Sequence, residues 1–97
     1  MVEQGDETDL TKLEEFLKVV SKSGVNLVIF SLEKRPKKFS QIMEETRLNP
    51  GIVDRSLKAL IELGLVSKSE GRYELTEKGI KALKVIKDIL DIVKQNS

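Results

Sequence analysis

The sequence predicts a mainly α-helical domain of the α+β class, with five helices and one two-stranded β-hairpin. Apolar residues recur at helical spacing in several segments, and the clearest stripe, which we expect to be buried in the core, consists of Val53, Leu57, Leu60 and Ile61. Two short alternating runs on either side of Glu70-Gly71 indicate the hairpin. The length of 97 residues favours a single domain, which we expect over residues 9–97.

The first third of the chain predicts two helices after an acidic tail. Residues 1–8 are polar and non-periodic, so we expect a mobile tail. Asp9 can cap a first helix, which Ser23-Gly24 is expected to end. A second helix is expected from Val25 to Lys34, before Pro36. The apolar face of the first helix consists of Leu10, Leu13, Phe16, Leu17 and Val20.

The middle of the chain predicts two helices joined by a tight turn. A short helix is expected from Ser40 to Thr46, with Ser40 as its N-cap and Ile42 and Met43 facing inward. Asn49 is a good N-cap, and Pro50 suits the first position of a second helix that reaches Leu63. Gly64 is typical of a helix C-cap, and the helix pair spans about residues 40–63.

The end of the chain predicts the hairpin over residues 65–75 and then a helix over residues 77–95, capped by Thr76. This last helix carries two adjacent apolar seams, of which one can pack on the domain's own core. The other seam predicts a homodimer, unless the N-terminal helix of the same chain covers both. The seam assigned to the dimer interface is Leu83, Ile86, Leu90 and Val93, and its neighbour is Ala82, Val85, Ile89 and Ile92.

Composition excludes several classes of function. The chain has no cysteine and no histidine, which removes thiolate and imidazole metal sites, thiol redox chemistry and the commonest general base. No nucleophile, phosphate-binding loop or paired-carboxylate arrangement is recognisable, so we expect neither an enzyme nor a cofactor. The longest apolar run, Leu27–Phe30, is too short for a membrane span, and no secretory signal is present, so we expect a cytoplasmic protein.

The net charge of +1 conceals an uneven distribution. Residues 1–33 carry 3 basic and 7 acidic side chains, whereas residues 34–75 carry 9 basic and 6 acidic ones. Residues 76–97 carry 5 basic and 3 acidic side chains. This asymmetry suggests an anionic partner for the middle segment, although ordinary variation in surface charge would look the same.

Four stretches in order carry a family resemblance. Phe39–Thr46, Leu48–Gly51 and Ile52–Leu63 have the pattern of a helix, a turn and a recognition helix, and Arg72–Gly79 contains the step Y-x-L-T-x-x-G into the next helix. Over about residues 25–80 the chain resembles a winged helix-turn-helix domain of the small archaeal and bacterial regulators of the ArsR-like and MarR-like groups. The resemblance implies binding to double-stranded DNA and regulation of transcription.

The recognition helix carries the residues predicted to read bases. Its N-terminal residues would reach base edges in the major groove. Arg55 could bind guanine O6 and N7 through both guanidinium nitrogens, and Ile52 could contact a thymine methyl group. Asp54 could accept a hydrogen bond from cytosine N4, or it could pair with Lys58 at i, i+4.

Other basic and polar residues are predicted to contact the DNA backbone. Lys58 lies one turn beyond Arg55, while Lys68 and Arg72 flank the tip of the wing. The connection before the short helix contains a basic cluster that either contacts phosphates or is simply solvated. From this region we assign Lys37, Lys38 and Ser40 to the DNA backbone.

The sequence leaves three functions open. The first is a homodimeric, sequence-specific transcriptional regulator, and the second is a weakly specific chromatin-associated protein. The third is a winged helix that serves only as a protein-interaction module, since a fold does not determine a function. A small-molecule effector could bind between the dimer helices, but no residue specifies one.

Overall fold

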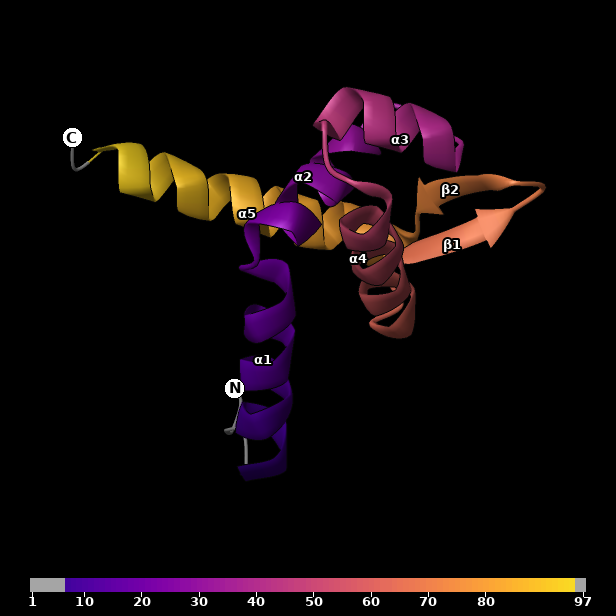
Figure 1. The fold of residues 1–97 in the computed structure, drawn as a ribbon. Coiled ribbons are helices and arrows are strands. Elements are labelled where there is room, and N and C mark those ends of the chain that lie inside the picture. Colours follow the sequence, from indigo (N-terminus) through magenta and orange to yellow (C-terminus); the bar gives the residue numbers. More distant parts are fainter. Residues whose placement is uncertain (1–6, 96–97) are drawn as a thin grey trace.

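The computed structural model describes residues 7–95, which form five helices and a two-stranded antiparallel sheet (Figure 1). The predicted fold class is therefore confirmed, and no helix in this range is long and apolar enough to cross a membrane. The elements in order are α1 (Glu7–Val20), α2 (Ser23–Ser31), α3 (Phe39–Thr46), α4 (Pro50–Glu62), β1 (Val66–Ser69), β2 (Arg72–Leu75) and α5 (Glu77–Gln95).

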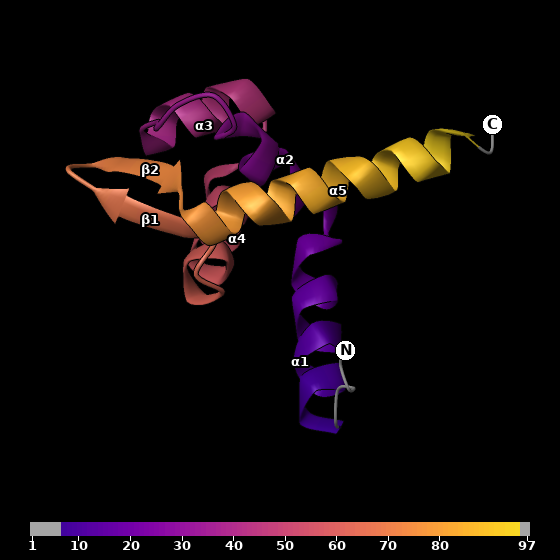
Figure 2. The same ribbon diagram turned by 180° about the vertical axis from the view of Figure 1, so that it is seen from behind.

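The first two helices differ from their predicted bounds. Helix α1 already includes Glu7 and Thr8, which were assigned to the tail, while residues 1–6 lie outside the described range. Ser23 and Gly24 begin α2 instead of ending α1, and α2 stops at Ser31, before the predicted Lys34. Figures 1 and 2 show α1 as an arm that runs away from the rest of the molecule, crosswise to α5.

The core lies where α2, α3 and α4 meet. Helix α2 packs against both α3 and α4, and α4 also contacts β1. The α4 stripe is buried at Val53, Leu57 and Leu60 as predicted, but Ile61 is exposed, so its assignment to the core was wrong. The most deeply buried large side chains are Val28, Ile29, Ile42, Val53, Leu57, Leu60 and Leu65.

Local hydrogen bonds hold the turn between α3 and α4. Arg47 ends α3 in the left-handed region (φ 63°), and its N–H donates to the Met43 carbonyl oxygen at 2.8 Å. The Asn49 side chain accepts from the Ile52 N–H at 2.9 Å, which confirms Asn49 as the N-cap of α4. Ser40 is not the N-cap of α3, because that helix begins at Phe39 and the N-cap position is Lys38.

We expect Asn49→Ala to lower the free energy of unfolding by about 1 kcal/mol, because the Ile52 N–H loses its acceptor. In a domain of this size the loss corresponds to a fall in Tm of about 4–8 °C. Asn49→Asp keeps an acceptor oxygen at the same position and serves as the matched control. Thermal denaturation followed by circular dichroism measures both; equal Tm values for wild type and Asn49→Ala would contradict the capping role.

The wing is the hairpin of β1 and β2, joined by a two-residue turn at Glu70-Gly71 as predicted. Both turn residues have positive φ, 51° for Glu70 and 77° for Gly71, which is the twist that tight hairpins favour. The backbone of Lys37 extends the sheet through two hydrogen bonds with Tyr73, at 2.9 and 2.8 Å. The wing is therefore attached to the connection before α3.

Helix α5 begins at the predicted cap. The Thr76 hydroxyl oxygen accepts from the Gly79 N–H at 3.0 Å, and the hydroxyl donates to the Gly64 carbonyl oxygen at 2.6 Å. Gly79 is buried against the Leu65 backbone, and a Cβ built on Gly79 would overlap the Leu65 carbonyl oxygen. An ion pair between Lys87 and Glu33 further ties α5 to the segment that follows α2.

Candidate nucleic-acid interface

Three of the four α4 residues predicted to contact DNA lie on its exposed side. Asp54, Arg55 and Lys58 are exposed, whereas Ile52 is half-buried beside the start of α2. Asp54 forms an i, i+4 ion pair with Lys58 at 3.0 Å, which is the second of the two roles considered for this carboxylate. Arg55 has no ion-pair partner among residues 7–95, so its guanidinium is available to a ligand.

The guanidinium of Arg55 lies close to the first turn of α4. A Cβ built on Gly51 would come within 3.5 Å of an Arg55 terminal nitrogen. A recognition helix contacts base edges with its N-terminal residues, so this is the end of α4 at which a base-reading side chain is needed. Arg55 is consequently the strongest candidate on α4 for contact with a base edge.

The wing lies beside α4 and carries two exposed basic side chains (Figure 1). Lys68 and Tyr73 are paired across the hairpin, and the Lys68 ammonium lies 5.2 Å from the centre of the Tyr73 ring. Arg72 begins β2 directly after the turn and has no ion-pair partner among the described residues. Both cations can therefore approach a phosphate, while Glu70 occupies the tip between them.

The basic connection before α3 divides into exposed and buried parts. Lys38 and Ser40 are exposed at the N-terminal end of α3, where backbone N–H groups favour a phosphate. Lys37 departs from its predicted role, because it is only 8% exposed and its ammonium forms an ion pair with Glu45. The two backbone hydrogen bonds to Tyr73 fix Lys37 in this position. Lys37 therefore holds the wing in place and is not available to contact a phosphate.

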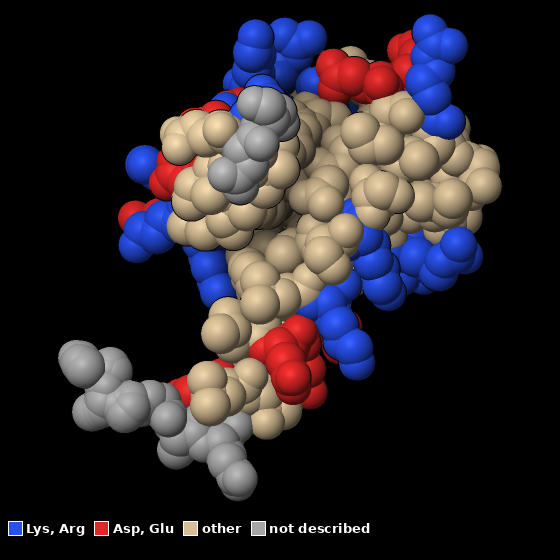
Figure 3. All heavy atoms as spheres, turned by 90° about the vertical axis from the view of Figure 1, so that its left-hand side faces the viewer, with Lys and Arg blue, Asp and Glu red and all other residues tan. Residues whose placement is uncertain are grey.

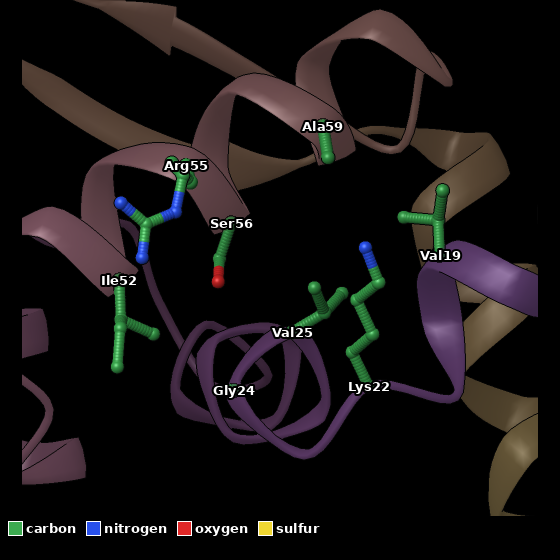
Figure 4. A pocket seen from close by; sticks show the side chains of 8 residues that line it. All are labelled: Val19, Lys22, Gly24, Val25, Ile52, Arg55, Ser56 and Ala59. Atoms are coloured by element: carbon green, nitrogen blue, oxygen red, sulfur yellow. The ribbon is translucent and has the colours of Figure 1, made fainter.

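A hollow beside Arg55 contains two residues that the sequence analysis did not single out. Lys22 and Ser56 point into it, while Arg55 lines its edge with the guanidinium turned toward Ile52 (Figure 4). No signal in the sequence singles out Lys22, because its place before the first residue of a helix follows only from the observed start of α2 at Ser23. Ser56 lies on the buried side of α4, and its burial could not be read from the apolar stripe alone.

The fold buries part of the predicted dimer seam on α5 and leaves the rest exposed. Leu83 is only 4% exposed and belongs to the core of its own chain, so its assignment to a dimer interface was wrong, and Ile86 packs partly against that core. Leu90 and Val93 remain exposed, as do Val85, Ile89 and Ile92 of the neighbouring seam. The single chain thus covers one side of the first half of α5 and leaves the rest of its apolar surface open.

Helices α1 and α5 together border an apolar groove. Its volume is about 300 Å³, and its walls include Phe16 and Leu17 from α1 and Val85, Ile86 and Ile89 from α5. Leu10 and Leu13 continue the exposed apolar face along α1. Figure 3 shows this side of the molecule as a largely uncharged surface with Lys, Arg, Asp and Glu at its margins. The N-terminal helix therefore borders the apolar face of α5 without covering it.

Comparison with known proteins places these features in a family. Residues 22–68 match the model of the arsR family of bacterial regulatory proteins. The HTH-type transcriptional regulator MJ0361 of Methanocaldococcus jannaschii is 31% identical over 86 residues, which cover 79% of this chain and 77% of that protein. Within residues 7–95 no cluster of acidic, cysteine or histidine side chains could hold a metal ion.

Solved structures of other proteins superpose on most of this chain. The quinone-bound YodB from B. subtilis superposes with a TM-score of 0.81 at 27% identity, covering 88% of this chain and 98% of that one. A protein from E. coli described as a predicted DNA-binding transcriptional regulator shares the fold, with a TM-score of 0.66 at 17% identity over 86% of this chain and 94% of that one. The chain belongs to the HTH-type transcriptional regulators, which are DNA-binding proteins rather than enzymes, and its match to the arsR family covers residues 22–68.

Proposed function

We propose that this regulator binds double-stranded DNA in a sequence-specific manner as a homodimer in the cytoplasm. The observation that carries the proposal is that Arg55 on α4, the recognition helix of a helix-turn-helix family, is exposed and has no ion-pair partner in the described part of the chain. An arginine there can bind guanine O6 and N7 in the major groove. Neutralisation of Asp54 by Lys58 weakens the repulsion between that carboxylate and nearby phosphates.

The DNA backbone would be held at three places around α4. The first is Lys58 on α4, one turn beyond Arg55. The second is the wing, with Lys68 and Arg72, and the third is the start of α3, with Lys38 and Ser40. Phosphate contacts of this kind fix the position of a protein on the duplex and make its affinity depend on salt. Ile52 and Asp54 are left with secondary roles, since one is half-buried and the other is paired.

Dimerisation would use the exposed apolar surface of α1 and α5 that surrounds the groove between these two helices. Nine of the eleven large apolar residues that residues 7–95 leave exposed are on these two helices. Exposed apolar faces of this extent commonly pair about a two-fold axis. Two recognition helices related in this way would enter successive major-groove faces about 10 base pairs apart. The dimer surface comprises Leu10, Leu13 and Leu17 of α1 and Val85, Ile89, Ile92 and Val93 of α5.

The proposal predicts distinct effects for two arginines. We expect Arg55→Ala to weaken binding to a selected duplex by about 10- to 100-fold, because a bidentate contact with guanine is lost. Arg72→Ala should weaken binding to all duplexes alike and lower the salt slope by about one unit. Fluorescence anisotropy with labelled duplexes, repeated at several salt concentrations, measures both effects.

The matched control is Lys94→Ala, which removes one positive charge from the last turn of α5, outside the proposed DNA contacts. This variant should bind DNA as the wild type does. The proposal fails if wild-type affinity does not change with salt, or if Arg55→Ala together with Arg72→Ala binds as tightly as the wild type.

A further inference from the structure

We propose that the hollow between α2 and α4 binds a small organic anion with an apolar part, and that the bound anion competes with DNA for Arg55. The hollow has a volume of about 230 Å³ and lies between the start of α2 and the side of α4 (Figure 4). Only the competition with DNA rests on the function proposed above; the binding of the anion stands on the pocket itself.

The two basic side chains that line this pocket are not balanced by an acidic lining residue. Lys22 extends from the start of α2 into the hollow, and Arg55 lines its edge on α4 with the guanidinium turned toward Ile52 (Figure 4). None of the lining residues is acidic, and neither cation has an ion-pair partner among residues 7–95. Because two cations and no carboxylate line this pocket, it favours an anionic ligand over a neutral one.

The start of α2 adds further hydrogen-bond donors. A helix leaves its first backbone N–H groups without intrahelical acceptors, and its dipole makes this end positive. The N-cap residue of α2 is Lys22, whose side chain cannot accept a hydrogen bond, and no side chain caps this helix. A lysine at the positive end of a helix is unfavourable on its own and becomes favourable when an anion lies beside it.

The Ser56 hydroxyl provides independent evidence for a ligand. Ser56 is only 4% exposed, and its hydroxyl makes no hydrogen bond with any residue of the described chain. Its Oγ faces the first turn of α2, where a Cβ built on Gly24 would lie 3.6 Å away (Figure 4). Buried hydroxyl groups are nearly always hydrogen-bonded, so this one lacks a partner that a bound anion would supply.

The remaining walls define the size and shape of the ligand. Val19, Val25, Ile52 and Ala59 are apolar and would cover an uncharged group. The volume corresponds to about eight water molecules, which suits a compact carboxylate of roughly nine non-hydrogen atoms. An anion held by Lys22 and Ser56 would draw the Arg55 guanidinium toward the pocket and away from a base. By linkage, DNA bound through Arg55 would weaken binding of the anion equally.

The first test titrates benzoate into the full chain and follows the backbone amide signals by NMR, with benzamide as the uncharged molecule of matching shape. We expect benzoate to shift the Gly24 signal in a saturable manner and to bind at least about tenfold more tightly than benzamide. Lys22→Gln and Ser56→Ala should each weaken benzoate binding by about tenfold. Lys18→Gln removes an exposed lysine one turn earlier, outside the pocket, and should change nothing.

The spectrum of each variant shows whether it is folded, so a loss of binding can be assigned to the pocket. Equal binding of benzoate and benzamide would overturn the proposal, as would signal shifts confined to other parts of the chain. Undiminished benzoate binding by both Lys22→Gln and Ser56→Ala would overturn it as well.

The second test measures DNA affinity at constant ionic strength with and without benzoate. At ten times its wild-type Kd, benzoate should weaken DNA binding of the wild type about tenfold and that of Lys22→Gln only about twofold. If benzoate does not bind but Lys22→Gln weakens DNA binding, the pocket receives a DNA phosphate and the proposal of a free anion is wrong. If no duplex binds at all, the proposed function fails. The benzoate titration still shows whether the pocket binds an anion.

Discussion

Gly79→Ala is expected to lower the free energy of unfolding by about 2–3 kcal/mol, a large part of the roughly 5–15 kcal/mol typical of small domains. The new methyl group would overlap the Leu65 carbonyl oxygen and come within 3.0 Å of the Leu65 carbonyl carbon. Because Leu65 also accepts the Thr76 N–H at 2.9 Å, relief of the overlap would disturb the junction of the wing with α5. Denaturation by urea, followed by circular dichroism, measures the loss.

Gly51→Ala is the matched control, since it makes the same substitution near the start of another helix. A Cβ on Gly51 would meet its nearest atoms at 3.4 and 3.5 Å, which is ordinary contact. Alanine favours a helix over glycine by up to about 1 kcal/mol, so this variant should be as stable as the wild type or more so. If Gly79→Ala unfolds at the same urea concentration as the wild type, the result would contradict the claim that α5 packs directly against the Leu65 backbone at Gly79.

Ile89→Glu is expected to convert the proposed dimer into monomers and to weaken DNA binding by about 100-fold or more. Ile89 is 49% exposed and lines the apolar groove between α1 and α5, so a carboxylate there would be buried without a partner at the interface. A monomer contacts one half-site instead of two and loses the gain in affinity that linked binding provides. Analytical ultracentrifugation measures the first effect, and fluorescence anisotropy measures the second.

Ile80→Glu provides the comparison for this prediction. Ile80 is 59% exposed on the same helix, but it lines a different hollow with Leu75 and Leu83. Nine residues separate the two isoleucines, which places them on opposite sides of α5. We expect Ile80→Glu to remain dimeric. A dimer that persists in Ile89→Glu, or that dissociates equally in both variants, would contradict the proposed dimer surface.

Features decided by local chemistry could be predicted from the sequence. Asn49 and Pro50 fix the start of α4, Glu70-Gly71 fixes the turn of the wing, and Thr76 fixes the start of α5, each through bonds within a few residues. These signals define the helix-turn-helix and the wing, and they place Arg55 on an exposed turn of α4. The candidate recognition surface therefore follows largely from the sequence.

Features decided by distant contacts could not be predicted. Periodicity identifies two apolar seams on α5, but only the packed fold shows that Leu83 belongs to the core while Val85 and Ile89 face the groove. Lys37 resembles any other lysine of its basic cluster until its backbone pairs with Tyr73, 36 residues later in the chain. Gly24 is expected to end a helix, yet it begins one at a close approach to Ile52.

Selection of bound duplexes from a random library tests the central claim most directly, because it reports specificity and dimer geometry together. The proposed homodimer should enrich an inverted repeat whose half-sites are about 10 base pairs apart, with at least one position relaxed in Arg55→Ala. A pool that binds without any enriched sequence would contradict a sequence-specific regulator and favour the chromatin-associated role. Failure to retain any duplex would favour a protein-interaction module instead.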